Sequence, residues 1–148
     1  MENPIFEGLN EEEKRSFLSL FTKKEVQKGD VIKQEGDRLK KGFFLENGRL
    51  VVKKHSSEGE IEVATISDSS LFFSLTCLVD GGKSLTTVEA QENSTILEIS
   101  QKEFFAFCQK NPATGVKILK NITLLLAKYL RKSDEKIVQM YKTLEEVL

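Results

Sequence analysis

The sequence predicts one domain of mainly β class, in which a compact antiparallel β body is closed by a long C-terminal helix. The first observation is a series of turn signals between about residues 22 and 100, spaced about seven to thirteen residues apart. That spacing is typical of an antiparallel sandwich, roll or barrel rather than of βαβ units. The second is the scarcity of helix breakers from about Pro112 to the C-terminus, where only Gly115 interrupts the pattern.

The N-terminal segment is predicted to be helical. Asn10 is a favourable N-cap, and Glu11 to Glu13 occupy the first turn, where acidic side chains interact favourably with the helix dipole. The apolar residues expected to face the core are Phe17, Leu18, Leu20 and Phe21.

Short strands are predicted between the turn signals. These signals are Gly29-Asp30, Gly36-Asp37, Asn47-Gly48, Glu58-Gly59, Ser67 to Ser70, Asp80 to Gly82 and Glu92-Asn93. Asn47-Gly48 lies between two apolar runs, a pattern that predicts a β-hairpin. In the later segment from Glu60 to Val63, Ile61 and Val63 alternate with glutamates, which predicts a strand with one apolar face.

Two helices are predicted after the β body. Ser100 can cap a short helix that carries Phe104, Phe105 and Phe107, and Asn111-Pro112 ends it. A second helix is predicted over about residues 113–147. Its heptad positions, seven of nine of them apolar, are Leu119, Thr123, Leu126, Leu130, Ser133, Ile137, Met140, Leu144 and Val147.

This narrow apolar seam is better suited to a partner helix than to the surface of the domain's own body. At about 1.5 Å per residue, the helix would also extend past the β body. We therefore expect a parallel homodimer. Its expected contact residues are Leu126, Leu130, Ile137, Met140 and Leu144. The alternatives are a helix that folds back on the β body or one that frays beyond Lys132.

Composition argues against several classes of partner. The 22 Lys and Arg residues nearly balance the 23 Asp and Glu residues, so the net charge of −1 predicts no strong attraction to nucleic acid or to an anionic membrane. No signal peptide is recognisable, and the longest mostly apolar stretch, from Ile122 to Leu130, is far short of the roughly 20 residues that span a bilayer. We expect a cytoplasmic protein in which Cys77 and Cys108 are reduced, buried thiols.

The residues that catalysis requires are missing from the sequence. His55 is the single histidine, too few for a metal site built from several imidazoles, and it is expected to be exposed. There is no Cys pair at metal-binding spacing, no G-x-S-x-G and no P-loop, and Asp80 to Gly82 is best explained as a plain turn. The sequence therefore predicts no enzyme, no metal and no cofactor.

Several motifs, in their order and spacing, resemble a known superfamily. They are the segments from Lys28 to Asp37, from Phe43 to Val52, from Thr87 to Ala90 and from Ile96 to Ile99, and Phe104 before Asn111-Pro112. From about Pro4 to Leu130 the chain resembles the cyclic nucleotide-binding domains of catabolite-activator-type transcription regulators, kinase regulatory subunits and gated channels. The resemblance implies a double-stranded β-helix, a jelly-roll-like β-roll of about eight strands, with a ligand pocket inside.

The resemblance also locates the family's phosphate-binding cassette at Leu71 to Val88. Phe73 stands at the family's Gly, Ser74 at its Glu, and Lys83 or Ser84 at its Arg, depending on where a one-residue gap is placed. Thr86 and Thr87 could still supply hydroxyls. The candidate ligand-binding residues are thus Phe73, Ser74, Leu75, Lys83, Ser84, Thr86 and Thr87.

These departures predict that cyclic nucleotides bind weakly or not at all. Removing one partner of a buried charged pair costs roughly 2–5 kcal/mol. Losing the ribose contact as well brings the loss to the order of 10³-fold in affinity. Phe73 is expected to fill the volume of the phosphate. The alternative is an outward-pointing Phe73 with an open pocket, in which Lys83 and Thr86 still hold an anion.

The resemblance therefore implies a non-enzymatic regulatory module. Two alternatives stay open: a functional sensor of a cyclic nucleotide or another small ligand, and a ligand-free scaffold for an unknown protein partner in signalling. In transcription regulators of this type a helix-turn-helix domain follows the long helix. No such segment follows the predicted helix here, so we expect no sequence-specific DNA binding.

Overall fold

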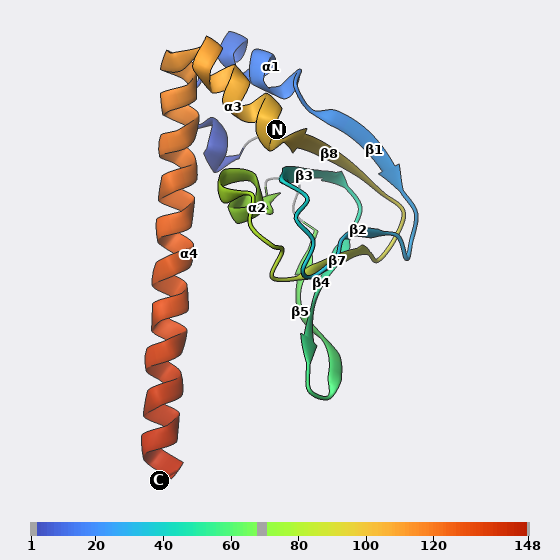
Figure 1. Ribbon diagram of the computed structural model, residues 1–148, viewed down its shortest axis with the longest axis vertical. Helices are drawn as coiled ribbons and strands as arrows, with labels where there is room; N and C mark the ends of the chain where they lie inside the picture. Colours follow the sequence, from blue (N-terminus) through green and yellow to red (C-terminus); the bar gives the residue numbers. More distant parts are fainter. Residues whose placement is uncertain (1–2, 68–70, 148) are drawn as a thin grey trace.

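The structure, a computed structural model, describes residues 3–67 and 71–147, so Asp68, Ser69 and Ser70 of one predicted turn lie outside the described residues. A 3-10 helix and a short α-helix precede the strands, another short helix interrupts them, and two helices follow them (Figure 1). The helices are η1 Pro4–Phe6, α1 Glu11–Leu18, α2 Leu75–Asp80, α3 Gln101–Lys110 and α4 Pro112–Val147. The strands are β1 Thr22–Val26, β2 Val31–Lys33, β3 Lys41–Asn47, β4 Leu50–Ser56, β5 Gly59–Ile66, β6 Phe72–Phe73, β7 Thr87–Ala90 and β8 Ser94–Ser100.

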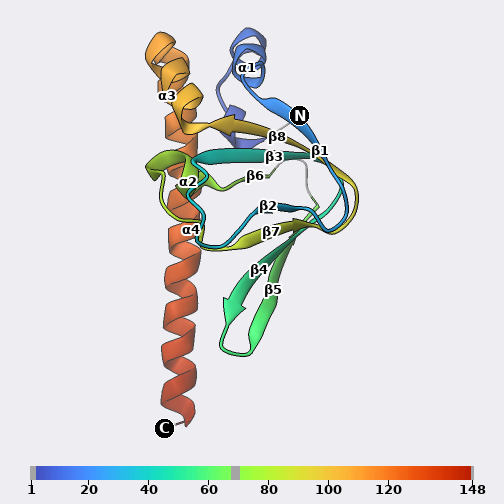
Figure 2. The same ribbon diagram turned by 45° about the vertical axis from the view of Figure 1, so that its right-hand side comes forward.

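The strands form two antiparallel sheets of four strands each. Their orders are β1-β8-β3-β6 and β2-β7-β4-β5. Figure 2 shows them as an upper and a lower layer, with α2 at the end of the roll that faces α4. The predicted fold class, a β-roll with flanking helices and a long C-terminal helix, is confirmed.

The predicted hairpin at Asn47-Gly48 is wrong. Strand β3 pairs with β6 and β8, whereas β4 pairs with β5 and β7, so the chain crosses from one sheet to the other at this turn. Gly48 has a φ of 109°, and a Cβ atom there would lie 2.0 Å from the Oγ of Ser94. The Asn-Gly signal thus marks a tight corner that needs glycine, and it carries no information about which strands then pair.

The hairpin between consecutive strands is β4–β5, which extends beyond the roll (Figure 1). Ile61 and Val63 alternate with glutamates as predicted, but they are 50% and 49% exposed because no second layer covers this part of the hairpin. His55 lies near its tip and is exposed, as expected.

Local signals for the helices are confirmed. The side chain of Asn10 accepts from the backbone N–H of Glu13, and the side chain of Glu13 accepts from the backbone N–H of Asn10, so α1 begins with a complete capping box. Ser100 caps α3 in the same way, by accepting from the backbone N–H of Glu103. Cys77 and Cys108 are both free and buried.

An aromatic cluster joins the helices to the roll. Phe17 of α1 is fully buried, and its ring centroid lies 5.2–6.2 Å from those of four neighbouring phenylalanines. These neighbours are Phe6, Phe21, Phe104 and Phe107. The N-terminal helices and α3 therefore share one apolar core.

The proximal part of α4 packs on this core. Ile118 and Ile122 are buried, and the amide of Asn121 donates to the backbone carbonyls of Ile5 and Glu7. Gly115 permits close packing, because a Cβ atom there would lie 2.8 Å from the Cα of Cys108. The helix is continuous through Lys132, and its distal part runs past the β body (Figure 1), so it neither folds back nor breaks there. Within the described residues, no helix is long and apolar enough to cross a membrane.

Glu13 links α1 to α4 through hydrogen bonds, and we expect it to make the free energy of unfolding depend on pH. Thr114 and Lys117 of α4 donate to its carboxylate at 2.6 and 2.9 Å. Hydrogen bonds from Thr114, from the Asn10 backbone and from Lys117 lower the pKa of Glu13 from 4.5 to about 2. Because the pKa is depressed in the folded state, this stabilisation is fully present above pH 4.5 and disappears as the pH falls towards 2.

We therefore predict that Glu13→Gln lowers the melting temperature at pH 6 and flattens its dependence on pH between about 4.5 and 2. Thermal unfolding followed by circular dichroism across this range measures the effect. Glu12→Gln, an exposed residue of the same helical turn, is the matched control. Parallel pH profiles for the wild type and Glu13→Gln would contradict the assignment.

Candidate ligand pocket of the β-roll

A cavity of about 280 Å³ opens where the end of the roll meets α2 and α4. It is near the lower limit of the roughly 300–1,000 Å³ usual for small-molecule sites. The lining residues come from β2, from the segment that includes β6 and the start of α2, from the segment before β7, and from α4. They are Lys33, Leu71, Phe72, Phe73, Ser74, Leu75, Thr76, Leu85, Thr86, Leu126 and Tyr129.

Phe73 points into the roll. It is 8% exposed, and its ring stacks on that of Phe43 with centroids 5.2 Å apart and planes 18° from parallel. It belongs to the core between the two sheets, together with Leu45 and Val88. The alternative with an outward-pointing Phe73 is therefore wrong, although a cavity does remain beside the ring.

Ser74 joins β6 to α2 in an unusual backbone conformation. Its φ and ψ of 67° and 32° lie in the left-handed region, which residues other than glycine rarely adopt. Its hydroxyl makes no capping hydrogen bond to α2, and the buried Oγ has no hydrogen-bond partner among the described residues. An unsatisfied buried hydroxyl is costly, so this atom is available to a ligand.

Three of the seven residues expected from the cassette lie outside the cavity lining. Lys83 is exposed, and Ser84 is 2% exposed and donates from Oγ to the carbonyl of Thr86 at 2.7 Å. The hydroxyl of Thr87 accepts from the backbone N–H of Glu35 at 2.9 Å. Of the expected residues, the cavity brings together Phe73, Ser74, Leu75 and Thr86.

Lys33 is the charged residue among the lining residues that the sequence analysis did not expect at the site. It is 8% exposed, and it makes no ion pair or side-chain hydrogen bond with any described residue. Desolvation by burial lowers the pKa of Lys33, while the thiol of Cys77, when ionised, would act in the opposite direction. Together with the missing ion pair, this direction indicates that the ammonium group is less well solvated here than in water.

A register shift explains why alternation could not identify Lys33. Val31 pairs with Glu89 of β7, and Lys33, two residues later, pairs with Val88, only one residue earlier. Such an irregularity places an extra residue on one strand and reverses the inward and outward alternation beyond it. Val31 is thus exposed and Lys33 buried, although two-residue alternation would put both on one face.

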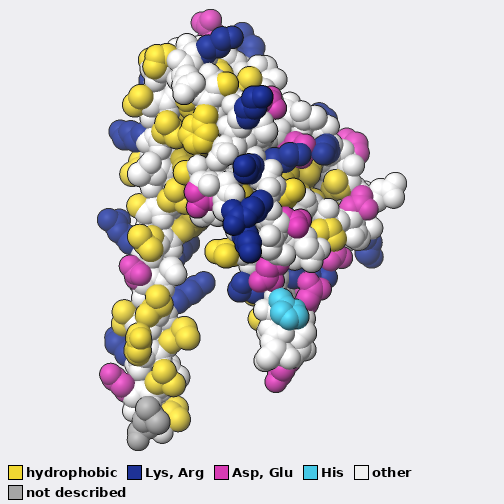
Figure 3. All heavy atoms as spheres, in the orientation of Figure 1, with side chains coloured by type: hydrophobic (Ala, Val, Ile, Leu, Met, Phe, Trp, Pro, Cys, Tyr) yellow, Lys and Arg dark blue, Asp and Glu magenta, His cyan; other side chains and the backbone are white. Residues whose placement is uncertain are grey.

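Helix α4 forms one wall of the cavity through Leu126 and Tyr129. Leu126, expected in the dimer seam, is half-buried here, and partial burial raises the pKa of the Tyr129 phenol. Figure 3 shows hydrophobic side chains on the surface of the distal part of α4. The seam residues beyond the cavity are 47–65% exposed. They are Leu130, Ile137, Met140 and Leu144.

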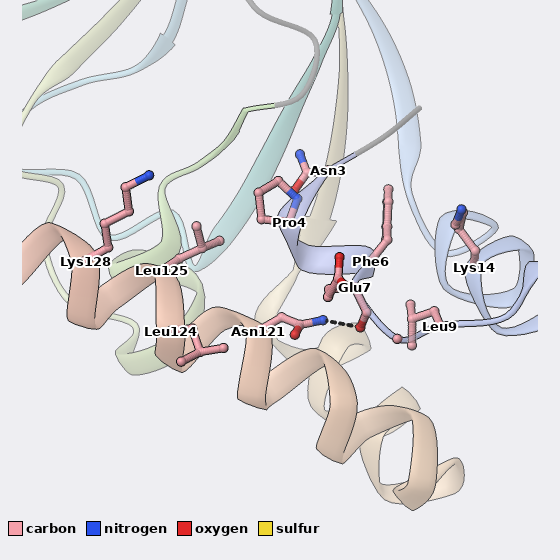
Figure 4. Close-up of a pocket in the computed structure, with 11 residues that line it drawn as sticks. Asn3, Pro4, Phe6, Glu7, Leu9, Lys14, Asn121, Leu124, Leu125 and Lys128 are labelled. Carbon is pink, nitrogen blue, oxygen red and sulfur yellow. Dashed lines mark hydrogen bonds between the residues drawn. The ribbon is translucent and has the colours of Figure 1, made fainter.

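A larger hollow of about 920 Å³ lies between η1, α1 and α4. Figure 4 shows Leu124 and Leu125 of α4 on one side and Phe6 and Leu9 on the other, with Asn121 bonded to the carbonyl of Glu7 between them. The buried amide of Asn121 attaches α4 to the N-terminal segment. We therefore interpret this groove as part of the packing between the helices. Within residues 3–67 and 71–147, no cluster of His, Cys, Asp and Glu side chains could hold a metal ion.

The fold has many relatives of known structure. The catabolite activator protein of Thermus thermophilus superposes with a TM-score of 0.85 at 24% identity, over 93% of this chain and 63% of that one. The N-terminal domain of a Streptomyces coelicolor transcriptional regulator gives a TM-score of 0.78 at 21% identity, over 90% and 93% of the two chains.

Curated sequences give two further similarities. The cyclic AMP receptor protein of Thermus thermophilus is 26% identical over 133 residues, which are 89% of this chain and 59% of that protein. Glutaminase 1 of Bradyrhizobium diazoefficiens is 27% identical over 136 residues, or 92% of this chain and 21% of that enzyme. The chain thus spans about three fifths of the first relative and a fifth of the second.

The family comparison covers most of the roll and α3. The model of the cyclic nucleotide-binding domain matches residues 23–111, from the first strand to the turn before α4. This range contains the two sheets, α2 and every lining residue of the cavity except Leu126 and Tyr129. The chain belongs to the cyclic nucleotide-binding domain family.

Proposed function

We propose that this protein is a non-enzymatic regulatory module in which cyclic nucleotide binding is weak or lost. The observation that carries the proposal is the buried, stacked ring of Phe73, at the position where the resemblance implies a glycine next to the ligand phosphate. Burial of a Phe side chain stabilises the empty roll by roughly 1.5–3 kcal/mol. A cyclic phosphate at this place would have to displace the ring.

The other two cassette positions support the same proposal. Ser84 is the more deeply buried residue of the candidate pair Lys83 and Ser84, so it is the better counterpart of the family's arginine, and its hydroxyl is already bonded to Thr86. Ser74 is too short to reach a ribose as a glutamate would. All three groups are therefore replaced. The phosphate loses its arginine, the ribose loses its glutamate, and the side chain of Phe73 prevents the close approach to the backbone that a glycine would allow.

A second candidate is a sensor for a different small ligand. The remaining cavity and its unpaired polar groups, Lys33 and Ser74, favour it over an empty scaffold. The scaffold alternative, with a protein partner in signalling, predicts no saturable small-molecule binding. Cytoplasmic location remains an expectation from the sequence.

The proposed assembly is a homodimer through α4. The exposed apolar residues of its distal part follow the predicted seam, and a second copy of the same helix supplies a matching stripe. Two-fold pairing is the commonest closed symmetry of protein oligomers. In this arrangement the two rolls lie beside the proximal parts of the paired helices.

Cyclic nucleotides should bind poorly to the unmodified protein. We expect isothermal titration calorimetry with cAMP and cGMP to give dissociation constants well above the micromolar range, or no saturable heat. The reason is the combined loss of the glycine, glutamate and arginine contacts at Phe73, Ser74 and Ser84. Saturable micromolar binding by the unmodified protein would refute the proposal.

A restoring variant tests the alignment itself. Phe73→Gly, Ser74→Glu and Ser84→Arg together should raise cAMP affinity, and the same triple change with Lys83→Arg in place of Ser84→Arg should not. Far-ultraviolet circular dichroism checks that both variants remain folded. A higher affinity of the variant with Lys83→Arg would show that Lys83 is the true counterpart of the arginine, and no gain in either variant would show that the rest of the roll has also changed away from nucleotide binding.

The dimer seam can be tested with a single charge. Ile137→Asp should convert a dimer into a monomer while the roll stays folded, because two carboxylates would be buried face to face in the helix pair. Multi-angle light scattering measures the mass. Val138→Asp introduces the same charge at a neighbouring, 52% exposed position outside the seam and is the matched control. A wild-type protein that stays monomeric at high concentration would rule out the dimer.

A further inference from the structure

Lys33 has an uncompensated charge. Its side chain is 8% exposed, whereas lysines are almost never fully buried without a partner. The ion pairs among the described residues all involve other lysines, and no carboxylate of those residues lies within ion-pairing distance of Lys33. An ammonium group at such a site, without a counter-ion, is less well solvated than in water.

The same cavity holds a second unsatisfied donor. Ser74 Oγ is buried without a hydrogen-bond partner among the described residues, and it lines the cavity together with Lys33. None of the eleven lining residues carries a carboxylate. The cavity is therefore lined by two hydrogen-bond donors, one from β2 and one from the β6–α2 junction. Its lining residues provide no negative charge.

The rest of the wall is mostly apolar. Leu71, Phe73, Leu85 and Leu126 contribute aliphatic and aromatic surface, and Tyr129 adds a ring from α4. A volume of about 280 Å³ admits a compact molecule and no more. Lys33 supplies one positive charge, which suits a ligand with one negative charge. A dianion would leave one negative charge without a counter-ion in the poorly solvated cavity.

From these observations we propose that the pocket binds a small organic carboxylate with an apolar body, and that Lys33 and Ser74 bind its carboxylate group. The inference deepens the proposed function, on which it rests, by naming the ligand class and a binding residue outside the cassette. The apolar body contacts Phe73 and the α4 residues Leu126 and Tyr129, so the ligand bridges the roll and the long helix.

Benzoate is a suitable probe, and benzamide is its uncharged counterpart of nearly equal shape. We expect benzoate to shift the amide resonances of Ser74 and Thr86 saturably in ¹⁵N-labelled full-length chain, with benzamide at least tenfold weaker. Lys33→Met should weaken benzoate about tenfold or more, as the loss of a charge-assisted hydrogen bond implies, and bring it to the level of benzamide. Lys28→Met, which removes an exposed lysine in a turn, should leave benzoate binding unchanged.

Thermal unfolding provides an independent readout. Unliganded Lys33→Met should melt at a higher temperature than the wild type, because methionine occupies a similar volume without a desolvated charge. Benzoate should raise the melting temperature of the wild type and of Lys33→Arg but not that of Lys33→Met. If Lys33→Met does not fold, Ser74→Ala serves as the second variant and should weaken benzoate severalfold.

Several outcomes would overturn the inference. They are equal binding of benzoate and benzamide, benzoate binding that Lys33→Met leaves intact, absence of saturable benzoate binding at millimolar concentration, and a lower melting temperature of Lys33→Met. Tighter binding of phenyl phosphate than of benzoate would overturn the preference for a single charge. Micromolar cAMP binding would refute the proposed loss of nucleotide binding. The benzoate comparison between wild type and Lys33→Met would still test the carboxylate site independently.

Discussion

The attachment of α4 to the helical core is the contact on which the arrangement of this protein depends. Ile118 and Ile122 are buried against the phenylalanine cluster around Phe17, and Asn121 is bonded to two carbonyls of the N-terminal segment. Gly115 lets the helix approach α3 closely. Because these contacts fix the start of a rigid helix, they also fix where Leu126 and Tyr129 meet the roll and in which direction the exposed distal part projects.

In the pocket, an aromatic side chain fills the interior, and polar side chains without partners among the described residues lie beside it. Phe73 stacks on Phe43 and belongs to the apolar core between the two sheets. Beside it, Lys33 is 8% exposed and has no ion pair with any described residue, and the buried hydroxyl of Ser74 has no hydrogen-bond partner among those residues. Residues that weaken a fold in this way are often kept for function. The fold of the family is thus present together with a lysine and a buried serine hydroxyl at the cavity.

Helix α4 connects this pocket to the proposed dimer seam. Leu126 and Tyr129 form a wall of the cavity, and the exposed seam begins with Leu130, one residue further along the same helix. A ligand that bridges the roll and α4 would make contacts that depend on the position of the helix. Occupancy could then favour one helix arrangement to the extent that the ligand binds it more tightly than another.

Local chemistry in the sequence determined where most elements begin and end. The caps at Asn10 and Ser100 and the break at Asn111-Pro112 act through neighbouring backbone groups, and for that reason they were predictable. Tertiary structure alone decided which strands pair after Gly48, because a corner residue fixes a turn but not a partner. It also decided that the apolar face of Ile61 and Val63 stays uncovered. Lys33 faces inward only because β2 and β7 pair with a register shift, and that shift arises between segments more than fifty residues apart. Burial and pairing at these positions depend on distant strands, which local sequence patterns do not encode.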